Sequence, residues 1–196
     1  MLVVMNNNSL KIKYGLIVLG SSMGAIASFI QLIEKLNLLK NPQVNLLCNV
    51  SSTLNCTSVL NAPQGSVLGF PNAMMSLILF VLFLGVGLVG LTGGSVSRGM
   101  RIFVQLLSLF TLGFGLWFLW QSTYNIGAIC LYCIVNFIGL IIINMSWVRI
   151  NYRDFFRSKN IKNKMIYIVE NNFDVVGWGF LTLLTLITIY LKLGVN

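Results

Sequence analysis

The sequence predicts an all-α integral membrane protein, and two observations support this fold class. The chain has 196 residues, of which 57% are hydrophobic and only 9% are charged, whereas a soluble domain carries roughly 25% charged residues. It also contains five apolar runs that lack Lys, Arg, Asp and Glu. A helix needs about 20 apolar residues to cross the hydrocarbon layer, where every backbone polar group must be paired within the helix. We therefore expect five transmembrane helices.

The expected helices follow the limits of these runs and cover residues 14–33, 71–91, 102–120, 127–148 and 175–191. The first run needs a separate argument, because the sequence AIA at 25–27 imitates a signal-peptidase site downstream of Lys11 and Lys13. The apolar run continues to Ile33, which is longer than a signal peptide requires. We therefore expect this segment to remain as a transmembrane helix.

Glycines inside the runs are expected to let neighbouring helices approach closely, because a small residue removes the side chain that would hold them apart. The same residues would weaken a helix in a soluble protein. The glycines concerned are Gly85, Gly87, Gly113 and Gly115.

The basic residues predict the orientation of the chain, because connections rich in Lys and Arg remain on the cytoplasmic side of a membrane. Ten of the 13 basic residues fall on one side: Lys11, Lys13, Arg98, Arg101, Arg149, Arg153, Arg157, Lys159, Lys162 and Lys164. The N-terminus is therefore expected in the cytoplasm. Orientation and attraction to anionic membrane lipid explain the net charge of +9, so no nucleic-acid partner is expected.

All four cysteines fall on the opposite, outer side. Cys48 and Cys56 lie in the outer connection 34–70, while Cys130 and Cys133 form a CxxC pair at the start of the fourth run. The space outside a bacterial plasma membrane, like the lumen of the endoplasmic reticulum, favours disulfides. The chain contains no histidine, which excludes Cys–His catalysis and His-ligated metal or haem. Thiol chemistry is therefore the leading hypothesis.

The outer connection combines two cysteines with a lack of charge. Residues 41–73 contain no charged side chain, and apolar positions such as Val59 and Leu60 could form a short amphipathic helix that lies in the membrane interface as a lid. Seven residues separate Cys48 from Cys56. This spacing permits either a disulfide between them or a flexible loop that carries Cys56 elsewhere.

The CxxC pair has a functional interpretation and several alternatives. Residues three apart share one face of a helix, so Cys130 and Cys133 could form a strained, reducible disulfide. The positive end of the helix dipole favours a thiolate, more strongly at Cys130 than at Cys133. The alternatives are cysteines that serve as buried apolar residues, static disulfides, and a four-cysteine zinc site, whose usual spacings do not match. A carrier that exports reducing power would need a cysteine pair on the cytoplasmic side, and the sequence shows none.

The order of the motifs resembles one known family. Cys48, Cys56, the sequence GFPNA at 69–73 and the sequence CLYC at 130–133 follow one another as in bacterial homologues of the vitamin K epoxide reductase family. The resemblance implies a four-helix transmembrane bundle that encloses a quinone, either ubiquinone or menaquinone, below the cysteine-bearing loop. The activity it implies is that of a membrane thiol:quinone oxidoreductase that supports disulfide-bond formation.

The resemblance also implies an electron route. A thioredoxin-like (DsbA-like) periplasmic protein would deliver electrons to Cys48, and Cys56 would then attack Cys130 in a helix disulfide. The released Cys133 would pass the electrons to the quinone. Many bacterial relatives carry a thioredoxin-like domain after a fifth helix, whereas this chain ends at Asn196. The partner is therefore expected to be a separate protein.

Residues from three of the predicted helices are expected to contact the quinone. They are Asn72, Met75, Phe114, Trp117 and Phe137. Asn72 matches the family's asparagine that hydrogen-bonds a quinone oxygen, and a polar amide at membrane depth needs a partner. Phe137 replaces a tyrosine of vertebrate family members, so it can pack against the ring but cannot donate a hydrogen bond.

These expectations divide the chain into a catalytic domain at 1–148, a basic cytoplasmic loop at 149–174, and a fifth transmembrane helix with its tail at 175–196. The expected location is the bacterial inner (plasma) membrane with the active site on the periplasmic side, since sequons at Asn49 and Asn55 would attach sugar to the redox loop in a eukaryotic lumen. The alternative from another class is a non-enzymatic membrane scaffold or metal-binding protein with structural cysteines.

Overall fold

The computed structural model describes residues 7–155 and 159–193, and it consists almost entirely of helices. The described residues contain five helices that are long and apolar enough to cross a membrane. They are α1 (Asn7–Lys40), α3 (Asn72–Leu91), α4 (Arg98–Gln121), α5 (Leu131–Phe155) and α7 (Phe173–Leu193). Shorter elements connect them: α2 (Cys56–Asn61), the 3-10 turn η1 (Pro63–Ser66), the π-helical turn η2 (Ser122–Ile126) and α6 (Lys159–Glu170). The predicted fold class, an all-α multi-pass membrane protein, is confirmed.

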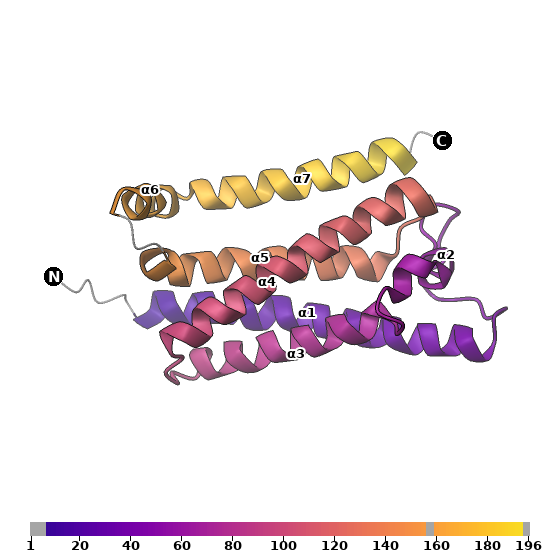
Figure 1. The fold of residues 1–196 in the computed structure, drawn as a ribbon, viewed down its shortest axis with the longest axis horizontal. Coiled ribbons are helices and arrows are strands. Elements are labelled where there is room, and N and C mark those ends of the chain that lie inside the picture. The colour runs from indigo at the N-terminus through magenta and orange to yellow at the C-terminus, as the bar shows by residue number, and fades with distance from the viewer. Residues whose placement is uncertain (1–6, 156–158, 194–196) are drawn as a thin grey trace.

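Helices α1, α3, α4 and α5 form a bundle, in which α1 packs against α3 and α5 and α4 packs against α5 (Figure 1). Helix α7 runs beside this bundle. Only 6% of its membrane-crossing segment is buried inside the protein, compared with 44% for the segment in α5. The architecture is therefore a four-helix bundle with a peripheral fifth helix.

An ion pair fastens the start of α7 to the bundle. The guanidinium of Arg149 on α5 donates to both carboxylate oxygens of Asp174 on α7, at 2.6 and 2.9 Å. A bidentate ion pair of this kind fixes the relative orientation of the two side chains as well as their distance. The contact lies at the end of α7 that adjoins α6.

The helix limits differ from those predicted at both sides of the outer connection. Helix α1 continues past Ile33 to Lys40, so Glu34 and Lys35 lie on α1 and not in a loop. Helix α5 begins at Leu131, because the chain takes a left-handed conformation at Gly127 (φ 74°) and is not helical through Cys130. Cys130 therefore precedes the helix. The residues between the expected helices 102–120 and 127–148 are also helical, because α4 runs directly into η2.

Glycines permit a close crossing of α1 and α5. A Cβ atom at Gly20 on α1 would lie 2.8 Å from the carbonyl oxygen of Gly139 on α5, and a Cβ at Gly139 would lie 2.7 Å from the carbonyl oxygen of Gly20. Real Cβ contacts of this length essentially never occur. The two backbones touch only because both positions lack a side chain.

The glycines singled out from the sequence behave unequally. A Cβ at Gly87 would meet Ile17 of α1 at 3.0 Å, so the expectation of close packing is correct there. A Cβ at Gly85 or Gly113 would meet nothing within 4 Å, and one at Gly115 would make an ordinary contact at 3.6 Å. The prediction was wrong for Gly85 and Gly113, because a glycine's position in an apolar run does not reveal which face of the helix it occupies. Gly115 faces Leu140 of α5 but leaves room for a methyl group.

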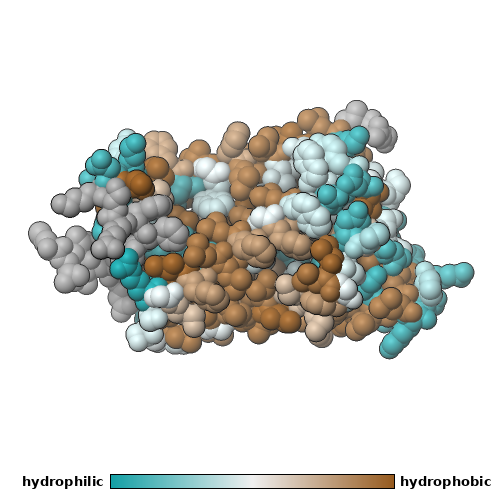
Figure 2. Space-filling view, in the orientation of Figure 1, coloured by the Kyte–Doolittle hydropathy of each residue, from teal (hydrophilic) through white to brown (hydrophobic). Residues whose placement is uncertain are grey.

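The two ends of the bundle hold different elements of the chain. The start of α1 and helix α6 lie at one end, and α2 with the end of α7 lies at the other (Figure 1). Helix α6 runs across the direction of the long helices, and a broad apolar band separates the two polar ends (Figure 2). The expected basic loop 149–174 is therefore largely helical, through the end of α5 and α6. Its Arg157 and the tail at 194–196 lie outside the described residues.

Candidate active site

The outer connection folds back so that its two cysteines join. Cys48 and Cys56 form a disulfide, which is one of the two arrangements that their spacing permits. The side chain of Asn49 accepts a hydrogen bond from the backbone N–H of Thr57 at 3.2 Å and donates to the Thr57 hydroxyl at 2.8 Å. Asn55 caps α2, since its side chain accepts from the backbone N–H of Ser58. These bonds connect the two arms of the loop beside the disulfide.

Backbone hydrogen bonds tie this loop to the segment that precedes α5. The N–H of Ile129 donates to the carbonyl of Thr53 at 2.7 Å, and the N–H of Asn55 donates to the carbonyl of Ile129 at 3.1 Å. Cys56 directly follows Asn55, and Cys130 directly follows Ile129. The pairing therefore brings together sulfurs that are 74 residues apart in the chain.

The sulfur atoms are close enough for exchange between the two cysteine pairs. The Sγ of Cys56 lies 3.1 Å from the Sγ of Cys130, and the sulfurs of Cys48, Cys56 and Cys130 all lie within 4.8 Å of one another. Cys130 and Cys133 are free thiols. Both Cys56 and Cys130 are fully buried. Thiol–disulfide exchange requires one sulfur to attack another, and this arrangement supplies that contact.

Cys130 lies where the backbone of α5 begins. Its carbonyl accepts the first hydrogen bonds of the helix, from the N–H groups of Cys133 at 3.1 Å and Ile134 at 3.4 Å. The thiol of Cys133 hydrogen-bonds the Cys130 sulfur and lowers the pKa of Cys130, with help from the backbone N–H groups of Cys133 and Tyr132 and against the effect of burial. The environment therefore favours a thiolate at Cys130.

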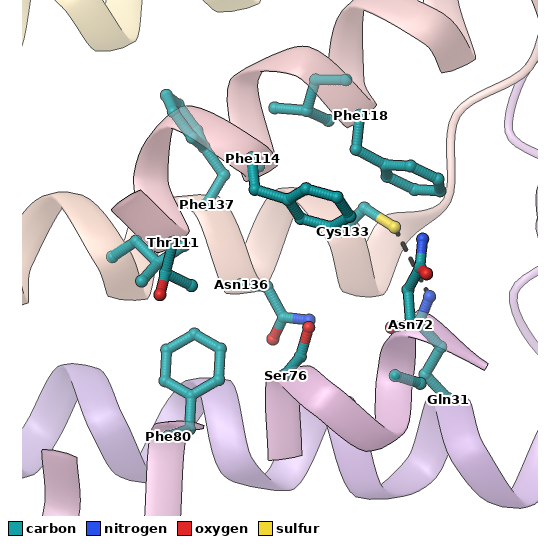
Figure 3. Close-up of a pocket in the computed structure, with 14 residues that line it drawn as sticks. Gln31, Asn72, Ser76, Phe80, Thr111, Phe114, Phe118, Cys133, Asn136 and Phe137 are labelled. Atoms are coloured by element: carbon teal, nitrogen blue, oxygen red, sulfur yellow. Dashed lines mark hydrogen bonds between the residues drawn. The ribbon is translucent and has the colours of Figure 1, made fainter. Parts of the chain in front are cut away.

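A cavity of about 60 Å³ lies inside the bundle next to Cys133 (Figure 3). Its walls come from α1, α3, α4 and α5. The lining residues are Gln31, Asn72, Ala73, Ser76, Phe80, Thr111, Phe114, Gly115, Phe118, Leu119, Cys133, Asn136, Phe137 and Leu140. Aromatic rings form one part of this wall, and amide and hydroxyl groups form another. The cavity can therefore offer both a flat apolar surface and hydrogen-bond donors.

Three of the five residues expected at the quinone site line this cavity, namely Asn72, Phe114 and Phe137. Asn72, Ser76 and Phe80 share one face of α3 because they are four residues apart. Met75 is offset from that face and lines a neighbouring apolar cavity of about 140 Å³ between α3 and α4, which Asn72 and Ser76 also line.

Trp117 also lies away from the cavity beside Cys133. Its side chain is 40% exposed, and its ring packs on Phe114 with the ring centres 5.4 Å apart. Met75 and Trp117 therefore do not line the cavity beside Cys133. Their positions in apolar runs gave no information on helix rotation.

The amide of Asn72 is engaged by the lid. Its Nδ2 donates to the carbonyl of Gln64 at 2.7 Å, and its Oδ1 accepts from the N–H of Val67 at 3.2 Å. Asn72 therefore fixes the end of η1 above the cavity. One Nδ2 hydrogen is left over by these two bonds, because a side-chain amide carries two donors and one acceptor oxygen.

Two residues of α1 in the site were not identified from the sequence. The Nε2 of Gln31 lies 3.5 Å from the Sγ of Cys133 and 4.0 Å from the Sγ of Cys130. An Oε2 atom of Glu34 lies 3.2 Å from the Sγ of Cys48. A glutamine within an apolar run, followed three residues later by a glutamate on the same helix face, is the signal that could have found them.

The arrangement of the clustered cysteines can be compared with what a metal site requires. Three sulfurs lie within 4.8 Å of one another, but two of them are joined in a disulfide. A metal binds thiolates, so this state leaves one thiol of the three as a ligand. The disulfide arrangement therefore fits redox chemistry better than ligation.

Comparison with known proteins adds one finding. The family described as the vitamin K epoxide reductase family matches residues 15–147 of the chain. No curated protein matches the sequence. The matched segment runs through α1, α3, α4 and most of α5, so it contains all four cysteines and every residue that lines the cavity.

Proposed function

Because this chain belongs to the vitamin K epoxide reductase family, we propose that it is a membrane thiol:quinone oxidoreductase that supports disulfide-bond formation. The observation that carries the proposal is the 3.1 Å distance between Cys56 of the loop disulfide and Cys130 of the CxxC pair. Cys133, the other member of that pair, reaches the cavity. In this proposal residues 1–148 carry the chemistry, and residues 149–174 lie in the cytoplasm.

The two cysteine pairs pass electrons in sequence. A thiolate of the partner attacks Cys48, which opens the loop disulfide, joins the partner to Cys48 in a mixed disulfide and releases Cys56 as a thiolate. The partner's second thiol then attacks the mixed disulfide, which frees Cys48 as a thiol and leaves a disulfide in the partner. Cys56 attacks Cys130 of a Cys130–Cys133 disulfide and releases Cys133. Cys48 then attacks Cys56, which closes the loop disulfide again and leaves Cys130 and Cys133 reduced. The structure, with a loop disulfide and two free thiols, corresponds to the state that follows this step.

The quinone accepts two electrons and two protons from Cys130 and Cys133, whose sulfurs become a disulfide. The cavity beside Cys133 has a volume of about 60 Å³, whereas a cavity of about 150 Å³ is known to hold a benzene ring. A neighbouring apolar cavity of about 140 Å³ shares Asn72, Ser76, Thr111 and Phe114 with it. Rotation of Phe114 would join the two spaces and admit the ring, with the isoprenoid tail between α3 and α4.

The partner is a thioredoxin-like periplasmic protein that carries a reduced dithiol. Cys48 is only 2% exposed, whereas the adjacent Leu47 is 91% exposed. A partner therefore has to displace the loop around Leu47 before it can reach the sulfur. The exposed apolar side chain of Leu47 gives such a partner a first contact.

A reconstituted assay tests the proposed function. Purified protein, a reduced thioredoxin-like protein and a quinone are mixed, and the quinone absorbance is recorded. We expect the wild type to consume quinone and to leave a disulfide in the partner. Cys133→Ala should abolish quinone reduction while the protein remains folded in the membrane, because no second sulfur can close the disulfide at the cavity.

Cys48→Ala serves as the matched variant. It should retain quinone reduction with a small permeant thiol, which can reduce the CxxC pair directly, and lose turnover with the protein partner. Normal turnover in Cys133→Ala would refute the assignment of Cys133. Equal losses with both reductants in Cys48→Ala would refute the shuttle.

A further inference from the structure

Glu34 is a buried carboxylate that the electron route above does not use. It lies near the outer end of α1 and is only 6% exposed. Its Oε2 is 3.2 Å from the Sγ of Cys48, and its Oε1 accepts a hydrogen bond from the Tyr132 hydroxyl at 3.1 Å. The backbone N–H of Leu47 also donates to this carboxylate. Donors from α5 and from the loop therefore hold one carboxylate oxygen against the sulfur.

Among the residues that the structure describes, none forms an ion pair with Glu34. The adjacent Lys35 donates instead to the carbonyl of Leu60 at 2.6 Å, at the end of α2. The titratable groups that face Glu34 are Cys48 from the loop, Tyr132 from α5 and, more weakly, Cys130. Burying a carboxylate is costly unless it is well hydrogen-bonded. A neutral amide would make the same contacts to Tyr132 and Leu47 at lower cost, so the acidic group calls for a chemical explanation.

We propose that Glu34 is a catalytic residue that exchanges a proton with Cys48. This inference rests on the proposed function and deepens it. When the disulfide between Cys48 and Cys56 forms again, the Cys48 thiol transfers its proton to the Glu34 carboxylate. The Cys48 sulfur then forms a bond to Cys56, the Cys56–Cys130 bond breaks, and its electron pair leaves on Cys130. The proton passes from Glu34 to solvent at the outer surface before the next cycle.

Proton transfer matters here because the thiolate is the reacting form of a cysteine. With an ordinary cysteine pKa of about 8.5, only about 3% of the thiol is ionised at pH 7. Cys48 is buried, so water has poor access to its proton. A carboxylate in contact with the sulfur can accept the proton directly, so the thiolate forms without access of water and without any change in the fold.

A two-phase quinone titration tests the proposal without a partner protein. The protein is fully reduced to four thiols, freed of reductant without oxygen and mixed with excess quinone. The wild type should consume two quinone molecules for each protein molecule. The first oxidises Cys130 and Cys133 to a disulfide, and the second is consumed after Cys48 and Cys56 have reduced that disulfide again. In Glu34→Gln, we expect the first phase to remain within about twofold of the wild type. The second phase should slow by about 30-fold at pH 7, which is the inverse of the ionised fraction of a free thiol.

Repeating the titration at pH 9 separates proton transfer from a structural role. At that pH most of a free thiol is ionised, so the defect of Glu34→Gln should shrink to about twofold. Glu34→Asp keeps the carboxylate and should retain part of the second phase. Glu170→Gln, which makes the same substitution at the opposite end of the bundle, should match the wild type in both phases.

The outcomes separate this inference from the proposed function. A second phase that is unchanged in Glu34→Gln, or slowed equally at pH 7 and pH 9, would overturn the role of Glu34 and leave the proposed function intact. A wild type that consumes no quinone in either phase would overturn both. Loss of the first phase in Glu34→Gln would show a general defect in the site and would also count against proton exchange at Cys48.

Discussion

Gln31 is the residue that links the CxxC pair to the first helix. Its amide nitrogen lies 3.5 Å from the Sγ of Cys133, and its side chain forms part of the cavity wall. An amide N–H cannot accept a proton, but it can donate to a thiolate and stabilise it. In the proposed electron route, Gln31 therefore acts on the sulfur that faces the quinone, while Glu34, one helical turn further along α1, acts on the sulfur that faces the partner.

Replacing this amide should slow the reaction at the cavity. We expect Gln31→Leu to reduce the rate of the first quinone phase by about tenfold or more, because a hydrogen bond to a charged group contributes about 1.5–3 kcal/mol. The measurement is single-turnover quinone absorbance of the fully reduced protein. Gln43→Leu, at an exposed position of the outer loop, is the control and should match the wild type. A first phase that is unaffected in Gln31→Leu would contradict the role of the amide.

At the level of helices, the crossing of α1 and α5 aligns the site. Gly20 and Gly139 bring the two backbones into contact in the middle of the bundle. Further along the same two helices, Gln31 and Glu34 of α1 meet Cys133 and Tyr132 of α5. A wider crossing would separate the amide from the sulfur. The glycines therefore affect stability and site geometry together.

This packing can be tested with one methyl group. Gly139→Ala places a Cβ 2.7 Å from the carbonyl oxygen of Gly20, and forced overpacking of this kind typically costs about 1–3 kcal/mol. We expect a lower thermal unfolding temperature in detergent and a slower first quinone phase. Gly113→Ala is the matched control, since its Cβ would meet nothing within 4 Å. Equal stability of the two variants would show that the α1–α5 crossing tolerates separation.

At the scale of the whole molecule, the sequence predicted what depends on local composition. The five membrane helices follow from the apolar runs, which are a property of neighbouring residues. The association of the four cysteines follows from the order of these helices, because successive connections lie on alternate sides of the membrane. Helix rotation did not follow, so the sequence could not show that Met75 and Trp117 lie away from the cavity beside Cys133. Glu34 was overlooked because its contact with Tyr132 joins residues 98 positions apart. The expected loop began at Glu34, whereas α1 continues through it.

The orientation of the molecule in the membrane is the remaining large-scale prediction. Arg98 and Arg101 lie at the end of the bundle that holds α6, and connections rich in basic residues stay in the cytoplasm. The disulfide-bearing end should therefore face the periplasm. We expect a membrane-impermeant maleimide to label Gln43→Cys on intact cells and to label Ser95→Cys, in the α3–α4 connection, only after permeabilisation. Both variants are made with the four native cysteines replaced by serine. The reverse pattern would place the redox pairs in a reducing compartment, where a stable loop disulfide is not expected, and would contradict electron transfer from a periplasmic partner.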